Sequence, residues 1–470
     1  MKKLRTSVRL ISTLLIVAFA ATAVFLCYSV YTQGGRWLTT QYNSRLTAAR
    51  NTVGMGTVYD RDGVRLAYTD SDGQRQYSAD EMTRRALSQT VGDQMSMSGT
   101  GVETFHANIL LGLSGSIIDR TWQYVTGKSY KGDNIRLTVD AELTSYISSQ
   151  FPSGKAGAVV VINYKTGEIL SMVSKPDYDP LVLATRQASA DTTGSGYLNR
   201  CLQGLYAPGS TFKIVTLAAA LENISDVDQV TYNCTGPIQL GNGTVSCFAG
   251  EVHGSMTLWQ AFAQSCNVTF ARLAAYMGGE KLIATAERMG FNDNFRFRDL
   301  VVYESSIPDT IDDAYELGWT GDGQGRLLVT PLHMAMITGA IANSGVMREP
   351  ALIAQVTGVG GIPRIRASAG IYGSVVSSDV ADKIAKAMQR TVQYGTATRA
   401  AIDGYTVCGK TGTAEVSDDP NALDNAWFVG FIDDDAHPYA ISVVVEEGGT
   451  GGSVAAPLAA KALRKAIDTV

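Results

Sequence analysis

The first pattern along the chain is an apolar run that extends from Leu10 to Tyr31, after a basic N-terminus. Roughly 20 apolar residues span a bilayer as a helix, whereas the apolar part of a secretory signal is about half that length. We therefore expect residues 10–31 to form an uncleaved transmembrane anchor. The alternative is a signal peptide that is removed, because Ala18-Phe19-Ala20 resembles a cleavage site.

The charges before the apolar run predict its orientation. Lys and Arg remain on the cytoplasmic side of a membrane helix. Four such residues stand in the first ten positions: Lys2, Lys3, Arg5 and Arg9. Residues 1–9 are therefore expected in the cytoplasm, and everything after Tyr31 is expected outside the cytoplasmic membrane.

Beyond the apolar run, residues 56–67 read GTVYDRDGVRLA, and this alternation predicts a hairpin whose turn needs positive φ at Gly63. From Ser71 to Gly132 the chain is polar and rich in Gly and Ser, without a clear periodic element. We expect residues 32–132 to form a small membrane-proximal pedestal.

A different pattern begins at Asp133. The segment NIRLTVDAELTSYISSQF predicts a short strand and an amphipathic helix, and AGAVVVINYKTGEILSMVS predicts two apolar strands joined by a turn. Because 470 residues exceed the usual span of one hydrophobic core, a second and larger domain is expected at residues 133–470.

The overall composition is that of a globular protein, with 45% hydrophobic and 18% charged residues. The net charge is -5, and no long basic run follows the N-terminus. This charge pattern argues against a nucleic-acid partner, because binding to a phosphate backbone needs a basic surface.

Six cysteines are present, of which Cys27 lies in the predicted anchor. Cys234 and Cys247 enclose a short Gly-rich segment and could form a local disulfide in an oxidising compartment. Equally, both could be free, small apolar residues. No Cys-x-x-Cys or His-Glu-x-x-His spacing occurs, so we expect no metal site.

The segment YAPGSTFKIVTLAAALEN carries the strongest chemical signal. Pro208 and Gly209 break the chain, and an apolar helix is expected to begin at Ser210. Lys213 follows one turn later on the same face. Burial of this lysine disfavours its ammonium form, so its free amine can take the proton of a nucleophilic Ser210. Alone, this spacing more often marks a capping serine and an exposed lysine.

Two later motifs support the assignment of Ser210. Ser265-Cys266-Asn267 lies between two helical patterns, where Ser265 could relay a proton to a leaving amine and Asn267 could hold Lys213 and the substrate backbone. The alternative is that Ser265 is the N-cap of the second helix.

The second motif is Lys410-Thr411-Gly412-Thr413 within a predicted strand. Gly412 permits close backbone approach, so an acyl donor could lie along this strand while the Lys and Thr residues bind its carboxylate. The tripeptide Lys165-Thr166-Gly167 has the same letters, but it lies between two apolar strands and is predicted to be a hairpin turn.

Ser-x-x-Lys together with Ser-Asp-Asn and Lys-Thr-Gly is the known signature of penicillin-binding proteins and class A β-lactamases, and Ser265-Cys266-Asn267 stands in the place of Ser-Asp-Asn. Residues 133–470 resemble more closely the transpeptidase domain of class B penicillin-binding proteins. The matching segments are TGEILSMVSKPDYDP, LYAPGSTFK, HGSMTLWQAFAQSCN, GQGRLLVTPLHMA, GKTGTAE, AWFVGF and GGSVAAPLAAKAL.

The resemblance implies an α/β fold of the α+β kind: a five-stranded antiparallel sheet, with the C-terminal helix on one face and a mainly helical subdomain on the other. It also implies a peptidoglycan D,D-transpeptidase that needs no cofactor and is acylated by β-lactams. The implied substrates are stem peptides ending in D-Ala-D-Ala, and the implied partner is a membrane glycosyltransferase.

By the same resemblance, Ser210 is acylated, Lys213 is its base, and Ser265 and Lys410 relay protons. Asn267, Thr411 and Thr413 bind substrate. Two alternatives remain at this point: a D,D-carboxypeptidase or β-lactamase that uses water as the acceptor, and a non-catalytic β-lactam sensor or scaffold. The intact set of polar side chains argues against the scaffold.

Overall fold

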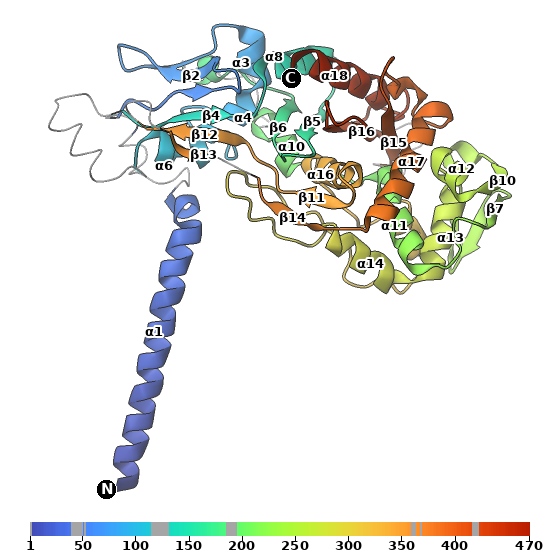
Figure 1. Cartoon of the computed structure of the whole chain (residues 1–470), viewed down its shortest axis with the longest axis horizontal. Helices are drawn as coiled ribbons and strands as arrows, with labels where there is room; N and C mark the ends of the chain where they lie inside the picture. Colours follow the sequence, from blue (N-terminus) through green and yellow to red (C-terminus); the bar gives the residue numbers. More distant parts are fainter. Residues whose placement is uncertain are drawn as a thin grey trace.

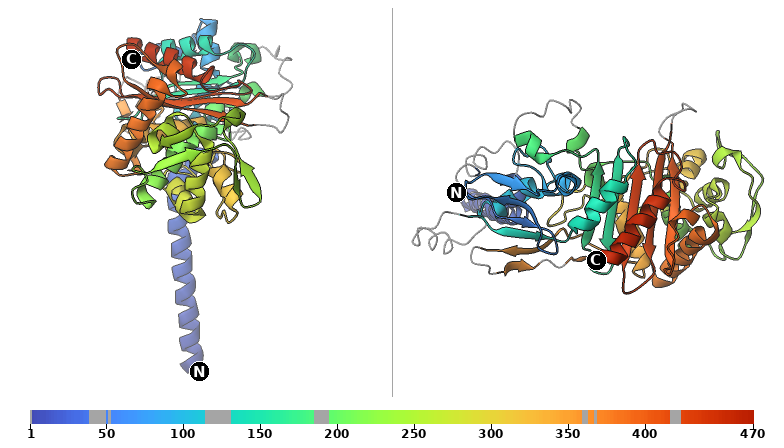
Figure 2. Two further views of the ribbon diagram at one scale, coloured as in Figure 1. Left: turned by 90° about the vertical axis from the view of Figure 1, so that its right-hand side faces the viewer. Right: turned by 90° about the horizontal axis from the view of Figure 1, so that it is seen from above.

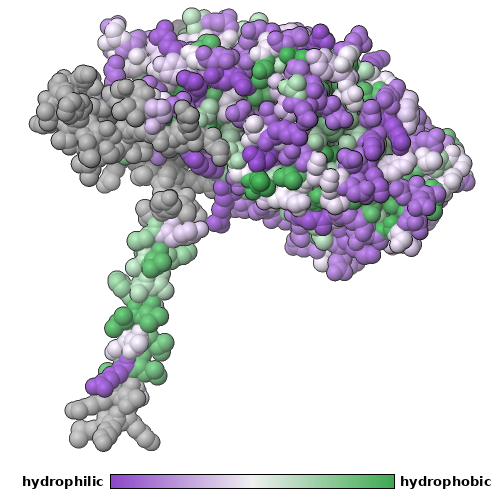
Figure 3. Space-filling model, in the orientation of Figure 1, coloured by the Kyte–Doolittle hydropathy of each residue, from purple (hydrophilic) through white to green (hydrophobic). Residues whose placement is uncertain are grey.

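The computed structural model of the chain describes residues 2–38, 50, 53–113, 131–184, 195–358, 363–366, 369–415 and 423–470. Helix α1 (Lys2–Leu38) projects from the folded body (Figure 1), and the coloured part of its surface in Figure 3 is mostly apolar. Its segment Ser7–Ser29 is long and apolar enough to cross a membrane. This helix agrees with a membrane anchor, because the apolar side chains of this segment are exposed in the part of the chain that the structure describes.

Next to α1 lies a six-stranded sheet with the order β13-β12-β4-β1-β2-β3. The predicted hairpin forms β1 and β2, and Gly63 in its turn has a φ of 91°, as expected. The strands are β1 (Val58–Tyr59), β2 (Arg65–Thr69), β3 (Arg75–Tyr77), β4 (Asn134–Leu137), β12 (Ile353–Thr357) and β13 (Pro363–Arg366).

This sheet combines distant parts of the chain. Strand β4 follows the domain boundary predicted at residue 133, yet it pairs with both β1 and β12. Short helices pack beside the sheet: α3 (Glu81–Ala86), α4 (Ser88–Val91), α5 (Val102–Phe105) and α6 (Ala107–Leu110). Residues 39–49 and 114–130 of the predicted pedestal lie outside the described residues.

The larger sheet has five antiparallel strands in the order β15-β16-β17-β5-β6, which confirms the expected fold. Its strands are β15 (Val407–Ala414), β16 (Asn425–Ile432), β17 (Tyr439–Val445), β5 (Gly157–Asn163) and β6 (Ile169–Lys175). Every residue of β16 and β17 is buried, which explains their continuous apolar sequence.

Helices cover both faces of this sheet (Figure 2). The C-terminal helix α18 (Ala455–Thr469) and α8 (Ala141–Gln150) pack on one face and enclose one hydrophobic core. On the other face lie α16 (Pro331–Ala342), α17 (Ser378–Tyr394) and α10 (Arg200–Gln203). Helix α16 is buried almost all round, since it packs both on the sheet and on its neighbours.

A mainly helical subdomain continues beyond the second face. It contains α11 (Lys213–Asn223), α12 (Leu258–Ala263), α13 (Asn267–Met277), α14 (Gly279–Arg288) and α15 (Ala314–Gly321). Short strand pairs lie at its margin: β7 (Thr231–Cys234) with β10 (Gly254–Thr257), and β8 (Ile238–Leu240) with β9 (Gly243–Val245). Elsewhere β11 (Val346–Arg348) pairs with β14 (Ile371–Ser374), and α9 spans Pro180–Ala184.

Candidate active site

A cleft of about 730 Å³ lies between the helical subdomain and the edge strand β15. A cavity of this size admits a small-molecule or peptide substrate. The side chains of all three predicted motifs reach it: Ser210, Ser265, Asn267, Thr411 and Thr413 all line its walls.

The nucleophile candidate stands on a short turn just before the first helix of the subdomain. The 3₁₀ turn η2 (Gly209–Phe212) leads directly into α11. The Gly209 amide donates to the Gly323 carbonyl at 2.8 Å, and a Cβ at Gly209 would stand 2.7 Å from the Thr413 carbonyl oxygen. The absence of a side chain at Gly209 therefore lets the Ser210 turn lie directly against β15.

Lys213 lies at the centre of the site and is fully buried. Its Nζ donates to Ser210 Oγ at 3.0 Å, to Asn267 Oδ1 at 2.6 Å and to the Ser265 carbonyl at 3.1 Å. The predicted pair of Ser210 and Lys213 is thus within hydrogen-bonding distance. The alternative of an exposed lysine beside a capping serine is wrong, because no surface of Lys213 reaches solvent.

A buried carboxylate faces the same lysine and was not expected from the sequence. Asp322 Oδ1 lies 3.3 Å from Lys213 Nζ, and only 2% of the Asp322 side chain is exposed. Burial raises the pKa of Asp322 to about 7, although the positive charge of Lys213 opposes this shift. The only sequence signal was an acidic residue inside the glycine-rich run GDGQG, far from either motif.

The second lysine of the site is Lys410 on β15, which is also fully buried. Its Nζ donates to Ser265 Oγ at 2.8 Å and to the Thr411 carbonyl at 3.1 Å. Burial, together with the nearby charge of Lys213, lowers the pKa of Lys410 well below its usual range. A neutral Lys410 amine can exchange protons with the Ser265 hydroxyl.

Ser265 occupies a sharp turn between α12 and α13. Its φ is 59°, a conformation that non-glycine residues rarely adopt and that often marks a functional site. The N-cap of α13 is Cys266, which makes no side-chain capping bond, so the alternative assignment of Ser265 as N-cap is wrong. The turn instead directs the Ser265 hydroxyl at Lys410.

Asn267 connects two walls of the cleft. Its Oδ1 accepts from Lys213, and its Nδ2 donates to the Ser246 carbonyl at 3.0 Å. This amide therefore holds the central lysine against the loop that precedes η3 (Phe248–Gly250).

Strand β15 is the outer strand of the five-stranded sheet, so among the described residues no strand pairs with its second edge. Thr411 Oγ1 lies 2.5 Å from Thr396 Oγ1, and the Thr413 carbonyl accepts from Gln324 Nε2 at 3.4 Å. A Cβ at Gly412 would lie 2.9 Å from the Pro208 carbonyl oxygen, which agrees with the predicted close backbone approach.

The tripeptide Lys165-Thr166-Gly167 lies away from this cleft, in the turn between β5 and β6. The Asn163 side chain accepts from the amides of Lys165 and Thr166, and Lys165 is exposed. Its prediction as a hairpin turn is confirmed.

Cys234 and Cys247 are both buried and free, with their sulfurs 3.8 Å apart. The sequence left open a disulfide or two separate thiols. Two further residues of metal-ligating type, His253 and Cys266, lie beside them. No local motif indicated this cluster, because 12, 5 and 12 residues lie between its successive members.

A serine that lies 3.0 Å from a fully buried lysine, beside the edge of a five-stranded antiparallel sheet, is the arrangement of a serine acyl-transferring enzyme. Residues 157–464, more than half of the chain, match the family model of the penicillin binding protein transpeptidase domain. The chain therefore belongs to the penicillin-binding protein transpeptidase family, and its resemblance to the class B members is confirmed.

Similar proteins come from several bacteria. The chain is 32% identical over 422 residues to peptidoglycan D,D-transpeptidase PbpA of Mycolicibacterium smegmatis, covering 84% of this chain and 86% of that protein. It is 29% identical to stage V sporulation protein D of Bacillus subtilis, and the match covers 78% of this chain and 60% of that protein. The structure of penicillin-binding protein A from M. tuberculosis, a ceftriaxone acyl-enzyme complex, matches with a TM-score of 0.81 at 28% identity. The match covers 89% of this chain and 99% of that chain.

Proposed function

We propose that this chain is a peptidoglycan D,D-transpeptidase in which Ser210 forms the acyl-enzyme. The observation that carries the proposal is the 3.0 Å contact between Ser210 Oγ and the fully buried Lys213 Nζ at the edge of β15. The M. smegmatis relative, a peptidoglycan D,D-transpeptidase, and the M. tuberculosis structure, a ceftriaxone acyl-enzyme complex, support the same reaction.

In the first step Lys213, in its free-amine form, takes the proton of Ser210 on Nζ as Oγ bonds to the penultimate D-alanine carbonyl carbon. The resulting oxyanion is held by the backbone amides of Ser210 and Thr413, whose segments lie against each other across Gly209. Asn267 and Asp322 fix the position of the lysine during this transfer.

Collapse of the tetrahedral intermediate breaks the bond to the terminal D-alanine. The proton that Lys213 took from Ser210 passes to the Lys410 amine and from there to Ser265 through their 2.8 Å contact, while the Ser265 hydroxyl protonates the leaving amine. The amine of a neighbouring stem peptide then attacks the ester and gives its proton to Lys213. Lys213 returns a proton to Ser210 Oγ as the cross-link forms and Ser210 is released.

The donor stem peptide adds to the open edge of β15 as an extra strand, as in other cases of β-strand addition. Thr411 and Thr413 would bind its terminal carboxylate from the cleft wall through their hydroxyl groups. A β-lactam would occupy the same position and acylate Ser210.

We further propose that α1 holds the enzyme in the cytoplasmic membrane as a single-pass protein, with the catalytic domain outside. The apolar span Ser7–Ser29 and the basic residues before it support this orientation. A membrane glycosyltransferase would supply the glycan strands to be linked.

Labelling of the full-length chain with fluorescent penicillin tests the assignment of Ser210. Wild type should label covalently, and Ser210→Ala should not. Thr166→Ala, in the turn of the second Lys-Thr-Gly, is the control and should label like wild type. Labelling of Ser210→Ala would show that another residue is the nucleophile.

A further inference from the structure

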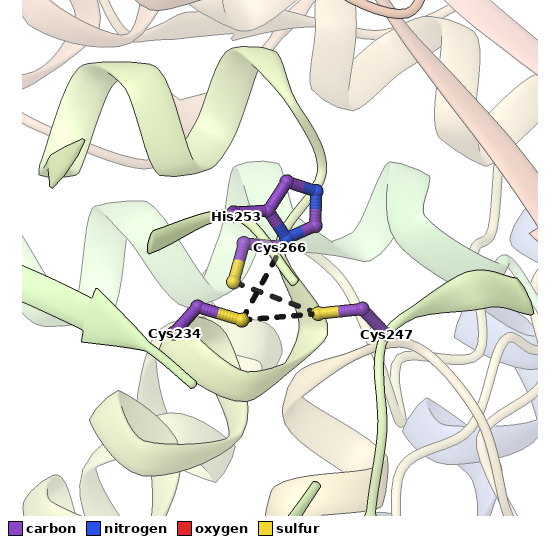
Figure 4. Close-up of side chains that lie close together, drawn as sticks. All are labelled: Cys234, Cys247, His253 and Cys266. Carbon is purple, nitrogen blue, oxygen red and sulfur yellow. Dashed lines mark hydrogen bonds between the residues drawn. The ribbon is translucent and has the colours of Figure 1, made fainter. Parts of the chain in front are cut away.

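Four side chains of metal-ligating type converge beside the active-site cleft: Cys234, Cys247, His253 and Cys266 (Figure 4). Their sulfur and nitrogen atoms all lie within 4.8 Å of one another. The three thiols are buried, and only 11% of the His253 side chain is exposed. Such a group needs an explanation, because buried polar atoms are normally matched with partners.

The distances within this cluster agree with the corners of a tetrahedron. Cys247 Sγ lies 3.8 Å from Cys234 Sγ and 3.7 Å from Cys266 Sγ, and His253 Nδ1 lies 3.7 Å from Cys234 Sγ. In a tetrahedral zinc site with zinc–sulfur bonds of about 2.3 Å, neighbouring sulfurs lie roughly 3.8 Å apart. The four atoms therefore already have the spacing of zinc ligands.

Disulfide bonding explains the cluster less well. One bridge would use two of the three thiols and leave the third thiol and the imidazole without a role. A Cys₃His set, in contrast, uses all four residues and is a common donor set of structural zinc. Because it fills all four positions, it leaves none open for a reacting water.

The surroundings of the cluster also fit a metal site. His253 turns Nδ1 toward Cys234, while its Nε2 lies 3.4 Å from the Glu251 carboxylate. Carboxylates in this position orient the histidine ligands of zinc. Thr269 donates its hydroxyl to Cys266 Sγ at 3.3 Å, a contact that stabilises a thiolate.

The fold places the four ligands on segments that also build the active site. Cys234 ends β7, His253 precedes β10, which pairs with β7, and Cys247 precedes η3 in the cleft wall. Cys266 stands between Ser265 and Asn267 at the N-cap of α13. A metal ion here would join the cleft wall to the turn that carries both of these polar residues.

We propose that Cys234, Cys247, His253 and Cys266 bind one Zn²⁺, which fixes the Ser265-Cys266-Asn267 turn for acylation. The cysteines bind as thiolates, so zinc binding releases their thiol protons to solvent. The ion is structural: it holds Asn267 against the Ser246 carbonyl and Ser265 in its left-handed conformation.

The first test measures the metal content of the full-length chain purified in detergent and dialysed against a chelator. Wild type should retain about one zinc ion per chain by elemental mass spectrometry. Cys234→Ser and His253→Ala should lose it. Cys201→Ser is the matched control, because Cys201 is equally buried but lies outside the cluster, and it should keep the zinc.

A second measurement needs no variant and so covers the case in which the variants fail to fold. Wild-type chain stripped of zinc and given Co²⁺ should show the thiolate-to-cobalt charge-transfer absorption of a tetrahedral site. The proposal would be overturned if the wild-type chain contained no bound metal and showed no such absorption after addition of Co²⁺. So would a Cys234–Cys247 disulfide in peptides prepared without reductant.

The positioning role is tested by penicillin acylation before and after zinc removal. The acylation rate should fall about 10-fold or more without zinc and return when zinc is restored, given the cost of misplaced groups. Unchanged acylation of the zinc-free chain would overturn this role. Because the metal content is measured independently of acylation, the zinc-binding proposal can be judged even if the transpeptidase proposal fails.

Discussion

Lys213 and Lys410 are both fully buried within one site, and each contacts different reacting groups. Lys213 faces the nucleophile, an amide and a carboxylate, whereas Lys410 faces the Ser265 hydroxyl. Burial of a lysine is expensive unless hydrogen bonds or a counter-charge compensate for lost hydration. The surrounding polar groups of the site provide that compensation.

Removal of the proposed base should slow acylation strongly without abolishing the fold. In Lys213→Ala we expect the second-order rate of penicillin acylation to fall about 100- to 10,000-fold, the usual contribution of a general base. Lys165→Ala, in the exposed Lys-Thr-Gly turn, is the control and should react like wild type. A near-normal rate in folded Lys213→Ala would show that another group takes the proton.

Asp322 should appear in the pH dependence of acylation. Its pKa of about 7 means that it gains a proton as the pH falls below neutrality. Protonation removes the negative charge that faces Lys213 Nζ, so Asp322 no longer holds the amine in position beside Ser210. The wild-type rate should therefore fall below about pH 7, and Asp322→Asn should lose this limb of the profile.

The control for this pH profile is Asp434→Asn, on the turn between β16 and β17. It should retain the wild-type limb because Asp434 pairs with His437, away from the site. If Asp322→Asn also kept the limb near pH 7, Asp322 would not be the titrating positioning residue.

At the residue scale, the active-site residues that could be predicted from the sequence are those that belong to local motifs. Ser210 and Lys213 share one helical turn, and Lys410 to Thr413 are contiguous. Asp322 and the Cys₃His cluster were missed because their partners are distant in the chain and meet only after the subdomain folds. No spacing rule connects such residues.

At the scale of elements, the contact between η2 and the turn after α15 positions the nucleophile. Gly323 has a φ of 87°, and a Cβ there would lie 1.9 Å from the Gly209 carbonyl oxygen. Gly323→Ala should therefore displace the Ser210 turn, lowering both the stability and the acylation rate.

Gly404→Ala is the control that separates the steric clash expected in Gly323→Ala from the cost of a positive φ. Gly404 has a similar φ of 85°, but a Cβ there meets nothing within 4 Å. Its substitution should cost about 1 to 2 kcal/mol from the left-handed backbone alone. Urea unfolding should show a loss in Gly323→Ala larger by roughly 1 to 3 kcal/mol, the cost of overpacking. Equal losses would contradict the proposed clash.

Elements with a strong hydrophobic pattern were predictable, and those without one were not. The hairpin of β1 and β2, strands β5 and β6, and helix α8 follow the expected periodicities. Helices α3 to α6 have only four to six residues each, too few for a periodic signal. Their region is held instead by buried polar contacts, such as that of Arg75 with Glu103.

At the scale of the whole molecule, the catalytic sheet could be expected from the family resemblance, but the composition of the six-stranded sheet could not. Strand β12 pairs with β4 across more than 200 residues. Pairing at this separation depends on the packed fold rather than on local sequence. The same sheet lies next to the apolar helix α1 (Figure 1).

The orientation of the molecule in the membrane can be tested by reporter fusions after Val470. Alkaline phosphatase, which is active only outside the cytoplasm, should be active, and β-galactosidase should not. Deletion of residues 2–38 should move the chain to the soluble fraction, since the apolar span is then lost. An active β-galactosidase fusion to the full-length chain would contradict the proposed topology.

The central proposal, an acyl group carried by Ser210 from one stem peptide to an amine, is tested most directly by product analysis. The full-length chain in detergent is given a stem-peptide donor ending in D-Ala-D-Ala and an amine acceptor. Mass spectrometry should find free D-alanine together with the cross-linked product, and neither with Ser210→Ala. Release of D-alanine by wild type without any cross-linked product would contradict a transpeptidase.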